Sequence, residues 1–165
     1  MGFLESVIPG YKGYRQREDS RNSDKQLRDF LANKLRQTRR RYEDIKIKIA
    51  DKGNLDLLKP AEKISQRLSR VIDRLVYANY GFSGKWWGEN KIGIEKLNQV
   101  YQFDQQLVEA VEDFEKEISE LEQIEHDQEI ESKLESLIVK ITQNDEALDN
   151  REAILRTIDS NQEDE

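Results

Sequence analysis

Apolar residues recur at steps of three and four along most of the chain, a spacing that predicts amphipathic helices. A first helix is predicted to begin near Ser23, which has the spacing of a capping box with Gln26, and to end at Gly53. A second helix is predicted from Pro60, which suits a first helical turn, to Gly81. Their apolar faces comprise Leu27, Leu31, Leu35, Thr38, Tyr42, Ile45 and Ile49, and then Ile64, Leu68, Val71, Leu75 and Ala78.

The last 72 residues contain neither glycine nor proline, which favours long helices there. A third helix is predicted to begin between Asn90 and Ile94. Its face comprises Leu97, Val100, Asp104, Leu107, Val111, Phe114, Ile118 and Leu121. A further apolar series belongs either to a fourth helix or to a continuation of the third, with residues 125–128 as the favoured bend. That series comprises Ile130, Leu134, Leu137, Ile141, Leu148, Leu155 and Ile158.

These elements predict an all-α fold, an antiparallel three-helix bundle or coiled coil with a long acidic C-terminal helix. The expected division is an irregular N-terminal segment over 1–22, a helical bundle over 23–125, and the acidic helix with a frayed tail over 126–165. The apolar stripe of the last helix either packs back on the bundle or forms a homo-oligomer with another copy.

Charge is distributed unevenly along the chain. Residues 1–90 contain 20 Lys and Arg against 12 Asp and Glu, whereas residues 91–165 contain 7 against 22. We therefore expect the basic first helix to lie beside the acidic third helix, although each half can also face a partner.

Several kinds of chemistry are excluded or disfavoured by residue types. The chain has no cysteine and one histidine, His126, which excludes disulfides, thiolate nucleophiles and multi-histidine metal centres within one chain. Glu122 and Glu129 would share a helical face with His126, but an exposed histidine is the favoured interpretation. No phosphate-binding loop or nucleophile elbow occurs. We expect a protein that is not an enzyme, with no catalytic residue, no cofactor and no metal.

Asp104 interrupts an otherwise apolar helical face. A buried carboxylate needs a cation or several hydrogen-bond donors, because isolated burial of a charge is very costly. Arg70 and Arg74 lie next to the apolar face of the second helix and are the predicted partners. A structural ion pair that fixes helix register is favoured over a catalytic or ligand-holding carboxylate.

Two groups of residues are candidates for contact with other molecules. A basic run with two nearby tyrosines suits nucleic-acid backbones and base stacking, but the overall acidity (pI about 5.0) argues against nucleic acid. This group comprises Arg36, Arg39, Arg40, Arg41, Tyr11 and Tyr14. An aromatic loop suits either a membrane surface, helped by Phe3, Leu4 and Ile8, or the capping of a bundle end. This group comprises Phe82, Trp86 and Trp87.

Three stretches carry a resemblance: IPGYKGYRQREDSRNSDKQLR at 8–28, DRLVYANYGFSG at 73–84 and VYQFDQQLV at 100–108. Over residues 8–125 the chain resembles a family of small bacterial and archaeal helical proteins with no established activity. The resemblance implies that the glycine–tyrosine entry, the turn and the Phe103–Asp104 pair belong to one architecture, and it supplies no catalytic residues.

The function expected from these observations is that of a cytoplasmic, non-catalytic helical scaffold or adaptor. It would act through helix–helix association with an unidentified protein partner. The alternatives are attachment to a membrane surface through the N-terminal and Trp86–Trp87 loops, and nucleic-acid binding through the basic first helix.

Overall fold

The computed structural model describes residues 2–14, 17–77 and 94–160, and every regular element within these ranges is a helix. The all-α prediction is therefore confirmed for the described part of the chain. The elements in chain order are α1 (Phe3–Val7), α2 (Arg17–Asp51), α3 (Leu55–Tyr77), α4 (Ile94–Leu121) and α5 (Asp127–Ser160).

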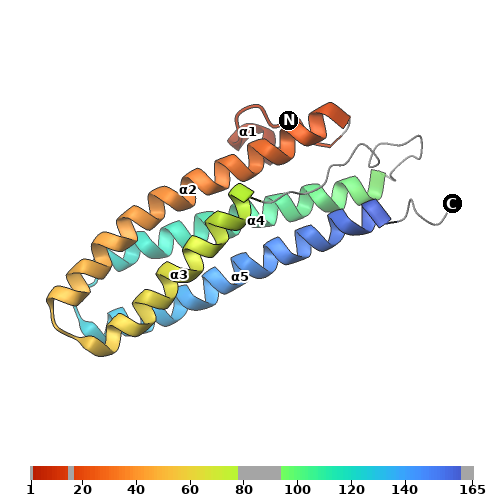
Figure 1. The fold of residues 1–165 in the computed structure, drawn as a ribbon. Coiled ribbons are helices and arrows are strands. Elements are labelled where there is room, and N and C mark those ends of the chain that lie inside the picture. Colours follow the sequence, from red (N-terminus) through yellow and green to blue (C-terminus); the bar gives the residue numbers. More distant parts are fainter. Residues whose placement is uncertain (1, 15–16, 78–93, 161–165) are drawn as a thin grey trace.

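The four long helices form a closed ring in which α2 packs on α3, α3 on α5, α5 on α4 and α4 on α2. Figure 1 shows two helical hairpins whose turns lie at the same end of the molecule. This arrangement differs from the predicted three-helix bundle, because α5 is a full member of the bundle. The alternative in which the last apolar stripe packs back on the bundle is confirmed. The apolar residues of α5 are buried there: Ile130, Leu134, Leu137, Ile141, Leu148 and Leu155. The stripe is thus unavailable as the predicted association surface.

Two helices begin earlier than predicted. The α2 helix begins at Arg17, not near Ser23, and the Ser23 hydroxyl bonds to Lys12 and Gly13 of the N-terminal segment instead of capping a helix. The α3 helix begins at Leu55, where the Oδ1 of Asn54 accepts a hydrogen bond from the backbone N–H of Asp56. Pro60 lies in the second turn of this helix. The segment predicted as irregular, 1–22, therefore contains α1 and the first turns of α2.

Both hairpin turns lie close to the positions predicted from the sequence. Gly53 has a φ of +75°, a left-handed conformation that glycine adopts without steric cost, and it lies two residues after the end of α2 at Asp51. The break between α4 and α5 spans residues 122–126, so the last apolar series forms a helix of its own. The carbonyl of His126 accepts the N–H of Ile130 in the first turn of α5.

The core is one continuous cluster that runs through the ring and also takes in Leu4 and Ile8 from the N-terminal segment. Tyr42 is buried in it, and its hydroxyl donates to the carbonyl of Ala61 at 2.8 Å, joining α2 to α3. Within the described residues, no helix carries an apolar stretch long enough to cross a membrane.

Opposite charges meet between the two hairpins. Nζ of Lys34 lies 3.0 Å from the carboxylate of Glu115. Arg41 makes a bidentate ion pair with Glu122, in which Nε and Nη2 each lie 2.8 Å from a carboxylate oxygen. The first pair joins α2 to α4, and the second joins α2 to the turn that follows α4. The prediction that the basic first helix lies beside the acidic third one is thus confirmed, and part of the charge asymmetry is neutralised inside the molecule.

Candidate functional site

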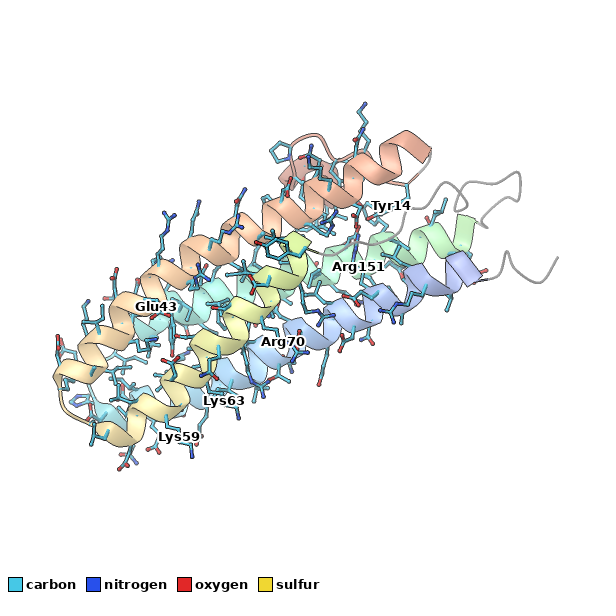
Figure 2. All side chains as sticks on the ribbon, in the orientation of Figure 1. Tyr14, Glu43, Lys59, Lys63, Arg70 and Arg151 are labelled. Atoms are coloured by element: carbon cyan, nitrogen blue, oxygen red, sulfur yellow. The ribbon has the colours of Figure 1, made fainter. Side chains whose placement is uncertain are left out.

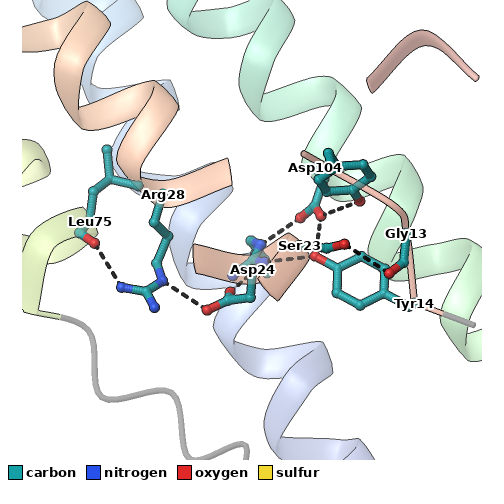
Figure 3. Close-up of polar contacts among 9 residues, drawn as sticks. Gly13, Tyr14, Ser23, Asp24, Arg28, Leu75 and Asp104 are labelled. Carbon is teal, nitrogen blue, oxygen red and sulfur yellow. Dashed lines mark hydrogen bonds and ion pairs between the residues drawn. The ribbon is translucent and has the colours of Figure 1, made fainter. Parts of the chain in front are cut away.

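Five buried polar residues from four segments of the chain come together in one cluster. Figure 2 shows two of them, Tyr14 and Arg151, toward the end of the bundle opposite the hairpin turns. We call the five residues the buried polar cluster; each member is at most 4% exposed. The helices α2, α4 and α5 contribute one charged residue each, and the segment before α2 contributes two hydroxyls. The members are Tyr11, Tyr14, Asp24, Asp104 and Arg151 (Figure 3).

Arg151 lies between two carboxylates and bridges three helices. Its Nε donates to Oδ1 of Asp104 at 2.6 Å, and its Nη2 donates to Oδ1 of Asp24 at 2.8 Å. Charge-assisted hydrogen bonds of this kind are stronger than neutral ones, and burial of these charges is tolerable because each is paired.

The two tyrosine hydroxyls complete the coordination of Asp104. Tyr11 donates to Oδ2 of Asp104 at 3.0 Å, and Tyr14 donates to the same oxygen. Nη2 of Arg151 donates to the Tyr14 hydroxyl at 3.1 Å. The two tyrosine rings meet edge to face, with centroids 6.1 Å apart. They therefore lie side by side, and both hydroxyls reach the same carboxylate oxygen of Asp104.

A second arginine extends the cluster to the end of α3. Nε of Arg28 donates to Oδ2 of Asp24 at 2.8 Å, and its Nη1 donates to the carbonyl of Leu75 at 3.1 Å. A cation at this position is favourable because the last carbonyls of a helix carry partial negative charge. With Arg28 included, two arginines balance the two aspartates, and all four carboxylate oxygens of Asp24 and Asp104 accept at least one donor.

The protonation equilibria follow from burial. Burial and the neighbouring Asp104 raise the pKa of Tyr11 and of Tyr14 far above the ordinary tyrosine value. Burial raises the pKa of Asp104 itself, although Arg151 opposes that shift. Burial works against the charge of Arg151, but Asp104, Tyr14 and Asp24 outweigh it and raise the pKa of the guanidinium. The cluster therefore holds its tyrosines protonated and its arginine charged near neutral pH.

The prediction that Arg70 and Arg74 are the partners of Asp104 is wrong. Asp104 is buried and paired with an arginine, but that arginine is Arg151 on α5. Arg74 contacts three acids on α5, namely Asp145, Asp149 and Glu152, and Arg70 is 69% exposed and lies 3.5 Å from Asp145. The reason is that α3 packs against α5, so its arginines meet the acidic residues of that helix.

Sequence reasoning missed Arg151 and Asp24, although the pattern contains a signal for both. Arg151 lies three residues after Leu148 and four before Leu155, and so occupies an apolar position of α5. Asp24 precedes the buried Leu27 by three residues. Three charged residues at core positions of three helices would have predicted one shared cluster.

Tyr11 and Tyr14 are buried, so they do not form the predicted aromatic and basic contact surface. The basic run is also divided among different neighbours. Arg41 contacts Ser119 on α4 and Glu122 in the turn after it, whereas Nη1 of Arg39 donates to Ser69 on α3 at 3.4 Å. Arg36 and Arg40 are exposed.

Of the residues predicted to contact a membrane, the structure describes only those near the N-terminus. Phe82, Trp86 and Trp87 lie outside the described residues. Of the N-terminal apolar residues, Leu4 and Ile8 are buried in the core, which removes them from such a surface, and Phe3 is 37% exposed.

The predicted sharing of a face by His126, Glu122 and Glu129 does not occur on one helix, because α4 ends before these residues and α5 begins within them. All three are exposed, and Glu122 is paired with Arg41. Among the residues that the structure describes, no group of three or more His, Cys, Asp or Glu side chains is placed to hold a metal ion.

Comparisons of the chain with protein-family models, with curated proteins and with solved structures found no match. The resemblance drawn from the three sequence stretches therefore stays a prediction, and the cluster is interpreted from its geometry alone.

Proposed function

We propose that the protein is a non-catalytic helical scaffold or adaptor that acts through helix–helix association with a protein partner. The proposal is supported by the contacts of the buried polar cluster. These contacts join helices to each other, and the carboxylate oxygens of the cluster already accept hydrogen bonds from other side chains. Ion pairs brace further seams, including Lys133 with Glu117 between α4 and α5 at 2.8 Å. A stiff body of this kind presents the outer faces of its helices.

The observation that carries the proposal is the outward face of α5. Glu135, Val139 and Glu146 follow each other at steps of four and seven, so they share one helical face, and all three are exposed. Val139 is 56% exposed, so its apolar side chain is available at this face. An apolar side chain between two acids suits a partner helix with an apolar and basic face.

Site-specific photo-crosslinking tests the association. A crosslinker placed at Val139 should capture a discrete partner in the native host, and unlabelled protein should compete for it. The same crosslinker at Gln37, exposed on α2, is the matched control. Charge reversal by Glu135→Lys and Glu146→Lys should abolish capture. Equal capture at both positions, or capture that survives charge reversal, would contradict this surface.

Nucleic-acid binding is the second candidate, because Arg36 and Arg40 are exposed one helical turn apart on α2. Binding through phosphate contacts weakens steeply with salt. A titration of DNA and RNA binding between low and high salt, repeated with Arg36→Ala and Arg40→Ala, tests it. Binding that is absent, or that is indifferent to both substitutions, would exclude this candidate.

A further inference from the structure

Residues 2–14, which we call the N-terminal strap, lie against the ring of long helices near the start of α2 (Figure 1). The α1 helix within it packs on α4. Leu4, Ile8, Tyr11 and Tyr14 are all buried, so the strap covers part of the core at this end of the bundle.

The strap has little stability of its own. Its helix α1 has five residues and no side-chain cap at its N-terminus, whereas isolated helices shorter than about a dozen residues are marginal in water. The ordered conformation therefore depends on docking. Two glycines, Gly10 and Gly13, adopt left-handed φ values of +80° and +77° next to the two tyrosines.

Polar contacts hold the strap to the bundle at both of its ends. The hydroxyls of Tyr11 and Tyr14 donate to Asp104. Oγ of Ser23 accepts from the N–H of Lys12 at 3.1 Å and donates to the carbonyl of Gly13 at 2.9 Å. At the other end, the Tyr101 hydroxyl accepts from the N–H of Leu4 at 3.2 Å.

The charge balance of the bundle does not depend on the strap. Asp24, Asp104 and Arg151 come from α2, α4 and α5, and their ion pairs are made without any strap residue. Removal of the strap would take two neutral hydroxyl donors from Asp104 and leave every buried charge paired.

We infer that the strap is a latch that opens as a unit while the four long helices stay folded. Tyr11, Tyr14 and Ser23 form the latch contacts. Opening uncovers Oδ2 of Asp104 and the apolar surface that Leu4 and Ile8 cover, so the closed strap withholds this end of the bundle from other molecules. This inference goes beyond the proposed function and does not depend on it.

Hydrogen exchange of the intact protein, read by mass spectrometry of peptides, tests the latch at neutral pH. In the unmodified chain, amides of residues 4–14 should exchange faster than those in the middle of α4. A double variant, Tyr11→Phe and Tyr14→Phe, should speed strap exchange about tenfold or more, since it removes three buried hydrogen bonds, two to Asp104 and one from Arg151. Peptides from α3 should change less than about twofold.

Two further variants separate latch opening from general destabilisation. Ser23→Ala removes two strap contacts without touching an ion pair, and it should also speed exchange in the strap alone. Tyr42→Phe removes another buried tyrosine hydroxyl, far from the strap in sequence, and should leave strap exchange unchanged. Cleavage by trypsin after the exposed Lys12 should follow the same order. Strap amides as protected as those of α4, or variants that accelerate all helices together, would overturn the inference.

Discussion

Nε of Arg151 lies 2.6 Å from Oδ1 of Asp104, and this contact joins α5 to α4 inside the bundle. The two residues are 47 positions apart, and both are essentially excluded from water. Around them, Asp24 accepts a hydrogen bond from Nη2 of Arg151, and the hydroxyls of Tyr11 and Tyr14 donate to Oδ2 of Asp104.

Removal of Arg151 should be strongly destabilising. Arg151→Met keeps most of the side-chain volume but leaves two buried carboxylates facing each other, so the free energy of unfolding should fall by about 3–5 kcal/mol. Urea denaturation followed by circular dichroism measures this. Arg156→Met, at a residue whose side chain is 82% exposed, is the control and should change stability by less than about 0.5 kcal/mol. Similar losses for the two variants would show that Arg151 is not held in a buried ion pair.

Loss of both members of the pair should cost less than the two separate losses added together. Asp104→Asn leaves Arg151 with one aspartate, and Arg151→Met leaves Asp104 with hydroxyls only, whereas the double variant leaves no buried charge of this pair uncompensated. A double-mutant cycle from denaturation curves should give a coupling of about 1–3 kcal/mol. Strict additivity would contradict a direct interaction.

Stability should fall at alkaline pH because of the buried tyrosines. Burial raises the pKa of Tyr11, Tyr14 and Tyr42, so the folded chain keeps these protons, whereas the unfolded chain releases them near pH 10. Above about pH 10 the unfolded state binds fewer protons than the folded one, and linkage then lowers stability as pH rises; below about pH 9 this contribution is fully present.

Thermal denaturation between pH 7 and 11 checks the alkaline effect. Tyr42→Phe should make the decline above pH 10 shallower, at a loss of about 1 kcal/mol at neutral pH for its hydrogen bond to Ala61. Tyr77→Phe, at a residue that is 76% exposed, should leave the slope unchanged. An alkaline slope that is the same in the Tyr42 variant would refute the assignment.

Gly53 should be the most sensitive residue of the first hairpin turn. A Cβ added there meets no atom within 4 Å, so any cost of Gly53→Ala comes from the left-handed φ of +75° and not from a clash. The expected loss is about 1–2 kcal/mol. Gly53→Asn should lose less, because asparagine tolerates this conformation better. If chemical denaturation ranks the two variants in the reverse order, the turn does not have this backbone conformation.

Much of the fold was predictable because its signals are local. The buried residues of α3, such as Ile64 and Leu68, and the end of α2 at Gly53 follow from periodicity and from a glycine in a turn. The start of α2 was not predictable in this way. Ser23 has the spacing of a helix cap, but its hydroxyl bonds to Lys12 and Gly13. These residues belong to a segment whose docking cannot be inferred from local sequence rules.

The amino-acid sequence by itself determined that the chain is helical and which face of each helix is apolar, because amphipathic spacing involves only neighbouring residues. It also determined that a buried Asp104 needs a cation or several hydrogen-bond donors. Only the tertiary structure decided that this cation is Arg151 and not Arg74, and that Tyr11 and Tyr14 are interior. The partner of a buried charge depends on which helices become neighbours in the ring, and that order is set by the packing of all four long helices together.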